Sequence, residues 1–172
     1  NEMSIKSFDG SFLIQNKNNK IVKKSELKCV TKLKPNKKEL SEIEFAFNIS
    51  KYVKSNAIIL CNNFSTIGIG GGQPSRVDSC RIAIQKAKKF QPKKISNAIA
   101  ASDAFFPFYD GLDLLIKAGV KIVIQPGGSL RDKEIISYAN NGHKLWRVPF
   151  ADCDVTEDPV HGRRTVWPLI VD

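Results

Sequence analysis

The chain has 172 residues, of which 42% are hydrophobic, and its formal net charge is +10. This length is typical of one domain with a sizeable core, and no stretch approaches the roughly 20 consecutive apolar residues of a membrane span. The basic residues are scattered singly and in pairs, without an arginine-rich stripe interleaved with aromatic residues. This pattern favours a solvated surface, or attraction of anionic small ligands, over binding to nucleic acid.

The four cysteines lie far apart, at positions 29, 61, 80 and 153, with no C-x-x-C pair. The spacing excludes the usual zinc and redox motifs, and we expect no metal ion. Cysteines of this kind are typical of reduced proteins of the cytosol, which is the location that we expect. Cys61 and Cys80 fall within apolar patterns, which predicts that both are buried.

The first elements along the chain are a hairpin and a helix. Residues 11–15 and 20–23 flank the polar run at 16–19, which predicts a hairpin with its turn in that run. Apolar residues recur at helical spacing over 38–53, which predicts an amphipathic helix.

Two apolar strands, 57–61 and 65–70, lead into the glycine-rich segment GIGGGQPSR at 68–76. Pro74 suits the first position of a helix, and the apolar residues that follow repeat at steps of three and four (Val77, Cys80, Ile84 and Ala87). Arg76 falls in the first turn of this helix, where free N–H groups favour an anion. The glycines have two interpretations, an anion-binding turn or a close crossing of strand and helix.

The second half alternates strands and helices. A helix with Gly119 as its stop follows the segment SDAFFPFYDG (102–111), and then come an apolar strand at 120–125, the turn PGGS and another helix. This order predicts an α/β fold with a right-handed βαβ crossover, helices on the faces of the sheet, and a mostly parallel or mixed sheet. Ligands of such sheets lie at the carboxyl ends of the strands, where GIGGGQPSR, DAFFPFYD and QPGGS all fall.

The segment SDAFFPFYDG has two interpretations of its own. Its phenylalanines and aspartates suit a core strand that runs into a turn. They also suit a pocket that stacks a flat polar ligand and hydrogen-bonds its edge. The residues alone leave both interpretations open.

The composition changes near residue 142. Residues 1–141 hold 20 Lys, 3 Arg, no His and no Trp, whereas residues 142–172 hold 1 Lys, 3 Arg, 2 His and 2 Trp. We therefore divide the chain into a body, 1–141, and a divergent tail of uncertain origin, 142–172. Because the body has no histidine, the usual group for proton transfer near neutral pH must come from elsewhere.

Four motifs of the body, SNAIIL, TIGIGGGQPSR, ASDAFFPFYDGLD and IQPGGSLRDKE, carry a specific resemblance. They are similar to the C-terminal part of the AICAR transformylase domain in the bifunctional purine biosynthesis enzymes, which join AICAR formyltransferase to IMP cyclohydrolase. The resemblance runs from about Gly10 to about Asn141. It implies a cytidine-deaminase-like α/β architecture and formyl transfer from 10-formyltetrahydrofolate to AICAR. A zinc deaminase would need H-x-E and P-C-x-x-C, and neither motif occurs.

The resemblance also implies what this chain lacks. In that family the cyclohydrolase domain and a Lys-His pair used for proton transfer lie N-terminal to everything in this sequence. We therefore expect a fragment with little or no turnover of its own, and we assign no catalytic residue. The full enzymes of the family are homodimers with active sites at the interface. The alternative function is a non-catalytic ligand-binding module, and a basic nucleic-acid binder is a remote third.

Three residues match family positions that bind AICAR. Asn56 matches a contact to the base, and its amide offers both a donor and an acceptor. Arg76 matches a substrate-binding arginine whose planar fork suits the anionic nucleotide. Phe105 matches a ring that lies against AICAR.

Four residues match positions that bind the folate. Asp110 matches the carboxylate that accepts N–H bonds from the pterin edge. The other three matches are Val77, an apolar contact, and Ser129 and Leu130, which follow the PGG turn.

The resemblance thus divides the segment SDAFFPFYDG. Phe105 and Asp110 are its functional pair, whereas we expect Phe106 and Phe108 to pack the sheet and Asp103 to tie down the loop. The family ends in a short basic and aromatic tail that does not align with GHKLWRVPFADCDV of this chain. No role is therefore assigned to Arg147, His143 or His161.

Overall fold

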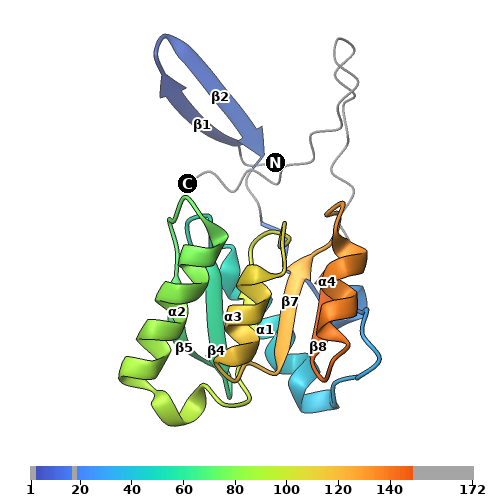
Figure 1. Ribbon diagram of the computed structural model, residues 1–172. Coiled ribbons are helices and arrows are strands. Elements are labelled where there is room, and N and C mark those ends of the chain that lie inside the picture. The colour runs from blue at the N-terminus through green and yellow to red at the C-terminus, as the bar shows by residue number, and fades with distance from the viewer. Residues whose placement is uncertain (1–2, 17–18, 149–172) are drawn as a thin grey trace.

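The computed structural model describes residues 3–16 and 19–148. They form a two-stranded sheet and a six-stranded sheet with helices on both faces (Figure 1). The larger sheet has the strand order β3-β8-β7-β6-β4-β5. Its strands are β3 (Lys28–Cys29), β4 (Ile58–Asn62), β5 (Ser65–Gly70), β6 (Ile99–Ser102), β7 (Ile122–Pro126) and β8 (Lys144–Val148).

The large sheet is mixed rather than mostly parallel. Strands β6, β7 and β8 are parallel to one another, as the predicted βαβ order requires. Strand β4 is antiparallel to both of its neighbours, β5 and β6, and β3 is antiparallel to β8. The α/β class and the mixed form of the sheet are therefore confirmed. Because only β4 and β3 are reversed, β5, β6, β7 and β8 all end at one edge, where β4 begins.

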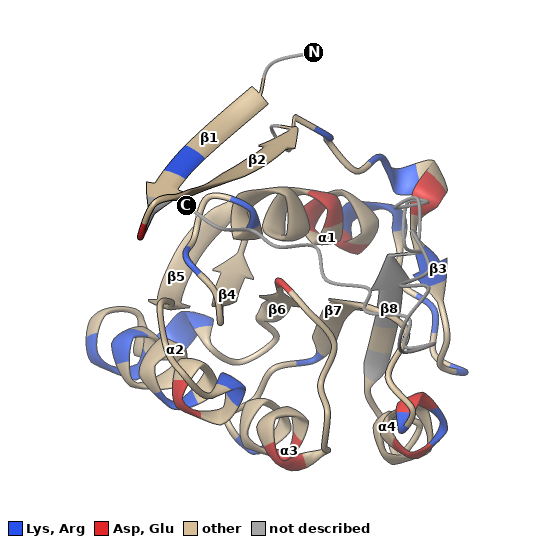
Figure 2. Cartoon of the chain, turned by 90° about the horizontal axis from the view of Figure 1, so that it is seen from above, with Lys and Arg blue, Asp and Glu red and all other residues tan. Residues whose placement is uncertain are grey.

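Helices cover both faces of this sheet, as Figure 2 shows in an end-on view. Helix α1 (Lys37–Ser50) lies on one face, and α2 (Arg76–Phe90), α3 (Asp110–Lys117) and α4 (Asp132–Ala139) lie on the other. The start of α1 is closed by a reciprocal cap, in which Asn36 Oδ1 accepts from Glu39 N (2.8 Å) and Glu39 Oε2 accepts from Asn36 N (2.8 Å). Two short 3-10 turns, η1 (Lys24–Glu26) and η2 (Pro92–Lys94), complete the connections.

The large sheet has a hydrophobic core on each face, and the side chains of β4 point alternately into one and the other. Ile58 and Leu60 pack toward α2, whereas Ile59 and Cys61 pack toward α1, and all four are fully buried. A strand that is apolar on both sides suits a central position, because helices cover each face. Cys61 and Cys80 are both buried, as predicted.

The predicted hairpin at 16–19 is wrong. The hairpin joins β1 (Met3–Phe8) to β2 (Ser11–Asn16), and its turn is Asp9-Gly10. These two residues have φ values of 43° and 74°, the left-handed conformation that two-residue hairpin turns require. One face of the hairpin exposes four large apolar side chains: Met3, Ile5, Phe12 and Ile14.

The segment after residue 141 enters the large sheet, because β8 pairs with β7 and with β3. Residues 149–172, which include Cys153 and His161, lie outside the described part of the chain. No helix within the described ranges combines the length and the apolar character that crossing a membrane needs.

Candidate functional site

The three predicted segments converge at one edge of the large sheet. Strands β5, β6 and β7 end there at Gly70, Ser102 and Pro126, and β4 begins there at Ile58. GIGGGQPSR, DAFFPFYD and QPGGS leave the sheet from this edge, as predicted. Because β4 starts where the others end, the residues just before it join the same site.

The glycine-rich segment serves close packing of β5 against α2. A Cβ atom on Gly68 would lie 2.2 Å from the Ala83 carbonyl oxygen, and one on Gly70 would lie 2.0 Å from that of Ser79. The structure thus gives these two glycines the role of a close crossing. Helix α2 begins at Arg76 after Ser75, so the prediction that Pro74 is its first residue is wrong.

Arg76 is a buried, paired guanidinium. Its Nη1 donates to Asp103 Oδ1 (2.6 Å) and to Ser102 Oγ (2.7 Å), and its Nη2 donates to Asn56 Oδ1 (2.8 Å). The side chains of Arg76 and Asp103 are only 9% and 1% exposed. Asn56 and Arg76, two of the predicted AICAR contacts, are therefore joined directly. The same bonds occupy much of the fork that the sequence assigned to an anion.

Asn56 is held on several sides. Its Nδ2 donates to the Gln73 carbonyl oxygen (2.9 Å), its backbone N donates to the same oxygen (3.1 Å), and its own carbonyl accepts from Ser79 Oγ (2.7 Å). The peptide bond between Ser55 and Asn56 is cis. These contacts connect the approach to β4 with the loop after β5 and with the start of α2.

The loop after β6 places two neighbouring phenylalanines differently. Phe106 is 1% exposed, and its backbone N donates to the side-chain oxygen of buried Gln125 (2.7 Å). Phe105, the predicted AICAR contact, is half-buried. Phe106 therefore packs in the core, as predicted. Phe108 does not: it is 48% exposed, with the Arg131 guanidinium 4.7 Å from its ring centre, so the prediction that it packs the sheet is wrong.

The predicted folate contacts lie on three elements of this edge. Asp110 is the exposed first residue of α3, and its Oδ1 accepts from Gly111 N (2.8 Å). Val77 is half-buried in the first turn of α2. Ser129 Oγ accepts from Arg131 N (3.1 Å) in the loop before α4, and neighbouring Leu130 is fully exposed. Within the described ranges, no hydrogen bond or ion pair joins this group to Asn56 or Arg76.

Asp103 has a larger part than the sequence indicated. It ties down the loop, as predicted, since its Oδ1 accepts from Ala57 N (3.0 Å) and its Oδ2 from Ser55 Oγ. It is also the carboxylate partner of Arg76. The available signal was its position directly after the buried strand that ends at Ser102, at the edge where ligands of such sheets bind.

Buried Cys80 lies on α2 near the Phe106 loop. Burial is the main cause that raises the pKa of its thiol to about 12, and the Arg76 charge opposes this only in part. The thiol is therefore protonated at neutral pH and is no nucleophile. Among the described residues, no group of three His, Cys, Asp or Glu side chains could hold a metal ion.

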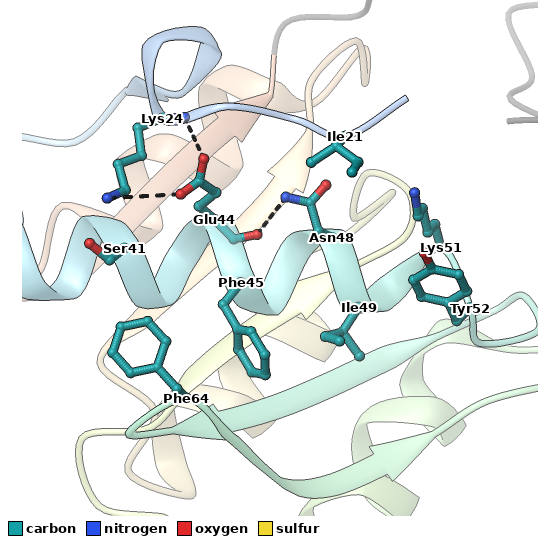
Figure 3. A pocket seen from close by; sticks show the side chains of 10 residues that line it. All are labelled: Ile21, Lys24, Ser41, Glu44, Phe45, Asn48, Ile49, Lys51, Tyr52 and Phe64. Carbon is teal, nitrogen blue, oxygen red and sulfur yellow. Dashed lines mark hydrogen bonds and ion pairs between the residues drawn. The ribbon is translucent and has the colours of Figure 1, made fainter. Parts of the chain in front are cut away.

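An open pocket of about 460 Å³ lies elsewhere, on the outer side of α1 (Figure 3). Phe45 and Phe64 meet edge to face at 5.9 Å on its floor, and Glu44 accepts from Lys24 N (3.1 Å) at its rim. None of the predicted AICAR or folate contacts lines it. This pocket is thus separate from the edge of the sheet at which Asn56, Arg76 and Asp103 are joined by hydrogen bonds.

Two solved structures are similar to part of the chain. One is a diaminohydroxyphosphoribosylaminopyrimidine deaminase/5-amino-6-(5-phosphoribosylamino)uracil reductase from Thermotoga maritima, with 18% identity, a TM-score of 0.39, and coverage of 63% of this chain and 34% of that protein. The other is Acinetobacter baumannii RibD, with 18% identity, a TM-score of 0.36, and coverage of 61% and 33%. The chain thus spans about a third of the length of each.

The sequence itself matches a known family. The sequence model of the AICARFT/IMPCHase bienzyme family matches residues 1–86, which is half of the chain. The matched part includes Asn56 and Arg76 and the strands that bring them together. The chain therefore belongs to the AICARFT/IMPCHase bienzyme family.

Proposed function

We propose that this chain forms part of the site in which a formyl group passes from 10-formyltetrahydrofolate to the amine of AICAR, in the synthesis of purines. The observation that carries the proposal is the direct hydrogen bond between Asn56 and Arg76 (2.8 Å) at the edge from which the Phe105–Asp110 loop also leaves. Residues from three separate motifs thus meet where ligands of α/β sheets bind.

The AICAR half of the proposal rests on Asn56 and Phe105. The Asn56 amide makes one bond through Oδ1 and one through Nδ2, so an acceptor lone pair and a donor N–H remain. Such a pair complements the carboxamide of AICAR. The half-buried Phe105 ring offers a flat apolar surface to the imidazole.

The folate half rests on Asp110. One carboxylate oxygen accepts from Gly111 N, and the other has no partner among the described residues. An exposed carboxylate at the edge can accept two N–H bonds from the 2-amino-4-oxo ring, and a charged acceptor makes these bonds stronger. Val77, Ser129 and Leu130 would line the rest of the folate. Their placement on two further elements means that the folate would bridge α2 and the β7–α4 loop.

The reaction needs proton transfers that we assign to no residue of this chain. The AICAR amine is a poor nucleophile, because its lone pair is delocalised into the ring and the carboxamide. Attack on the formyl carbon forms a tetrahedral oxyanion, and the folate nitrogen must leave with a proton. The described residues bind and orient, which contributes through proximity. We therefore propose that the chain alone turns over little or not at all. A second copy in a homodimer, a cyclohydrolase activity of the full enzyme and a cytosolic location belong to the same proposal.

Calorimetric titration with a 10-formyltetrahydrofolate analogue tests this function. Wild-type chain is compared with Asp110→Ala and with Asp113→Ala, a matched truncation one turn further along α3. Loss of the charge-assisted bonds at Asp110 costs about 1.5–3 kcal/mol, which is roughly tenfold to a hundredfold in affinity. Asp113→Ala leaves the affinity unchanged. Equal affinities for all three chains would remove Asp110 from the site, and absence of binding in all three would show that this chain does not hold a folate site by itself.

A turnover assay separates the proposal from its alternative, a non-catalytic module. Formyl transfer that appears when this chain is mixed with the N-terminal part of a full-length relative, which carries the proton-transfer pair, would argue against the module. Turnover by the isolated chain at the rate of a full enzyme would contradict the proposed division of roles. A chain that binds both ligands and never supports transfer in any mixture would favour the module.

A further inference from the structure

We propose that Asp103 is a positioning residue for the nucleotide half of the site. It holds the Arg76 guanidinium and, through Arg76, fixes which way the Asn56 amide faces. The inference rests on the proposed function for the identity of the ligand. The arrangement itself stands on the contacts of Asp103, Arg76 and Asn56.

The first step is that Asp103 is bonded to groups of its own chain and is closed off from a ligand. Its Oδ1 accepts from Ala57 N (3.0 Å) and Arg76 Nη1 (2.6 Å), and its Oδ2 accepts from Ser55 Oγ. The side chain is 1% exposed. A carboxylate that is surrounded by donors of its own chain acts through those donors and not by touching substrate.

The second step concerns charge. A buried guanidinium without a partner would be strongly unfavourable, so the 9% exposed Arg76 needs Asp103 to stay where it is. Ser102 reinforces the arrangement, because its Oγ accepts from Arg76 Nη1 (2.7 Å) and donates to the Ala104 carbonyl oxygen (2.6 Å). The guanidinium is therefore fixed in position as well as in charge.

The third step is the orientation of the Asn56 amide. A guanidinium only donates hydrogen bonds, so the atom that faces Arg76 Nη2 at 2.8 Å must be the amide oxygen. The amide nitrogen then faces the Gln73 carbonyl oxygen at 2.9 Å, which only accepts. A flipped amide would lose both bonds. The remaining acceptor and donor of Asn56 are thereby presented to a ligand in one fixed order.

Asp103 thus acts on the ligand through two successive contacts, from Asp103 to Arg76 and from Arg76 to Asn56, and the first of them is closed off from solvent. Asp103→Asn keeps the size of the side chain and removes its charge. The guanidinium then lacks its counter-charge, and the bond from Arg76 Nη2, one of the two that orient the Asn56 amide, loses its fixed position. If Asp103 served stability alone, Asp103→Asn would destabilise the fold without changing the hydrogen bonds that Asn56 makes to the ligand.

A double-mutant cycle on nucleotide affinity distinguishes the two roles. AICAR is titrated into wild-type chain, Asp103→Asn, Asn56→Ala and the double variant, with Ser41→Ala on the outer side of α1 as control. We expect Asp103→Asn to weaken binding about tenfold in the wild-type background and less than about twofold in the Asn56→Ala background. Equal losses in both backgrounds, or no loss in either, would overturn the inference.

A second measurement needs no ligand. The side-chain amide signals of Asn56 are identified in an NMR spectrum by their absence in Asn56→Ala. We expect them to shift in Asp103→Asn and to stay in place in Ser41→Ala. Unshifted signals would overturn the inference even if the nucleotide binds. A wild-type chain that binds no AICAR but shows the shift would count against the proposed function and leave the link from Asp103 to Asn56 standing.

Discussion

Gly70 on β5 and Ser79 on α2 approach so closely that a Cβ atom on Gly70 would lie 2.0 Å from the Ser79 carbonyl oxygen. The obstructing atom belongs to the helix backbone, so it cannot swing aside as the end of a side chain could. Ser79 also donates from its Oγ to the Asn56 carbonyl oxygen (2.7 Å). The contact therefore sets both the packing of α2 and the position of the site.

Gly70→Ala should push α2 away from the sheet. We expect the free energy of unfolding to fall by about 1–3 kcal/mol or more, the range seen when a packed core is overfilled. Urea denaturation measures the change. Lys88→Ala, at an exposed position of the same helix, is the control and should stay within about 0.5 kcal/mol of wild type. A Gly70→Ala chain as stable as the control would show that strand and helix can separate freely.

The two phenylalanines at 106 and 108 should differ sharply in their effect on stability. Phe106 is 1% exposed and Phe108 is 48% exposed. Phe106→Ala should cost about 3–5 kcal/mol, because it empties a large buried volume. Phe108→Ala should change the free energy of unfolding by no more than about 0.5 kcal/mol. Thermal and urea unfolding of both variants provide the comparison, and similar losses would contradict the placement of Phe108 at the surface.

Alkaline pH should destabilise the fold through Cys61 and Cys80. Burial raises the pKa of each thiol from 9.0 to about 12 in the folded chain. Below pH 9 both states keep the proton, so the thiols contribute no pH dependence. Between pH 9 and 12 the unfolded chain loses protons that the folded chain retains, and stability falls by up to about 1.4 kcal/mol per pH unit for each thiol.

Replacement of the thiols tests this sign. The free energy of unfolding is measured between pH 8 and 11 for wild type, Cys61→Ala and Cys80→Ala, because other groups that titrate in this range cancel in the difference. Each variant should lose stability less steeply than wild type above pH 9. Parallel curves would mean that the two thiols titrate alike in the folded and unfolded chains.

Tyr138 should control the acidity of Asp113 on the neighbouring helix. The Tyr138 hydroxyl donates to Asp113 Oδ1 (2.6 Å), and Lys117 pairs with the other oxygen (2.7 Å). The bond from Lys117, followed by that from Tyr138, lowers the pKa of Asp113 below 3.8. The stabilisation linked to this carboxylate is present above its unfolded pKa and is lost as pH falls through the folded one.

Tyr138→Phe should therefore raise the pKa of Asp113 toward its ordinary value. An NMR titration of the Asp113 carboxyl signal measures the change. Tyr109→Phe is the matched control, because the Tyr109 ring stacks on Tyr138 at 5.3 Å. If both variants shift the pKa of Asp113 equally, ring packing rather than the hydroxyl bond is responsible.

Periodicity predicted the elements of the large sheet well where their apolar pattern was long. The helices and the strands β4, β5 and β7 appear close to the ranges that the spacing predicted, because each buries a stripe or a face that repeats in the sequence. The hairpin was misplaced since residues 16–19 looked like a turn by composition, whereas the Asp9-Gly10 pair supplies the left-handed φ values. The Asp9-Gly10 pair is therefore the stronger local signal for a hairpin turn.

The candidate site was predicted less completely. The resemblance selected Asn56 and Arg76, and the structure shows them bonded to each other. It could not show that Asp103 would be the buried partner of Arg76, because that contact spans 27 positions along the chain and depends on the reversed direction of β4. Phe106 and Phe108 were indistinguishable by type, since only the fold of the loop decides which ring turns inward.

The buried pair of Arg76 and Asp103 has an electrostatic consequence for any ligand of this edge. The fields of a cation and an anion in contact cancel at distances beyond their separation. The Arg76–Asp103 pair therefore adds almost nothing to the field of a chain with a net charge of +10. Ionic strength should therefore act on binding through the lysines at the surface, which attract an anion from a distance and are screened by salt. The Asn56 amide distinguishes ligands by the order of its hydrogen-bond donor and acceptor, and salt does not change that order.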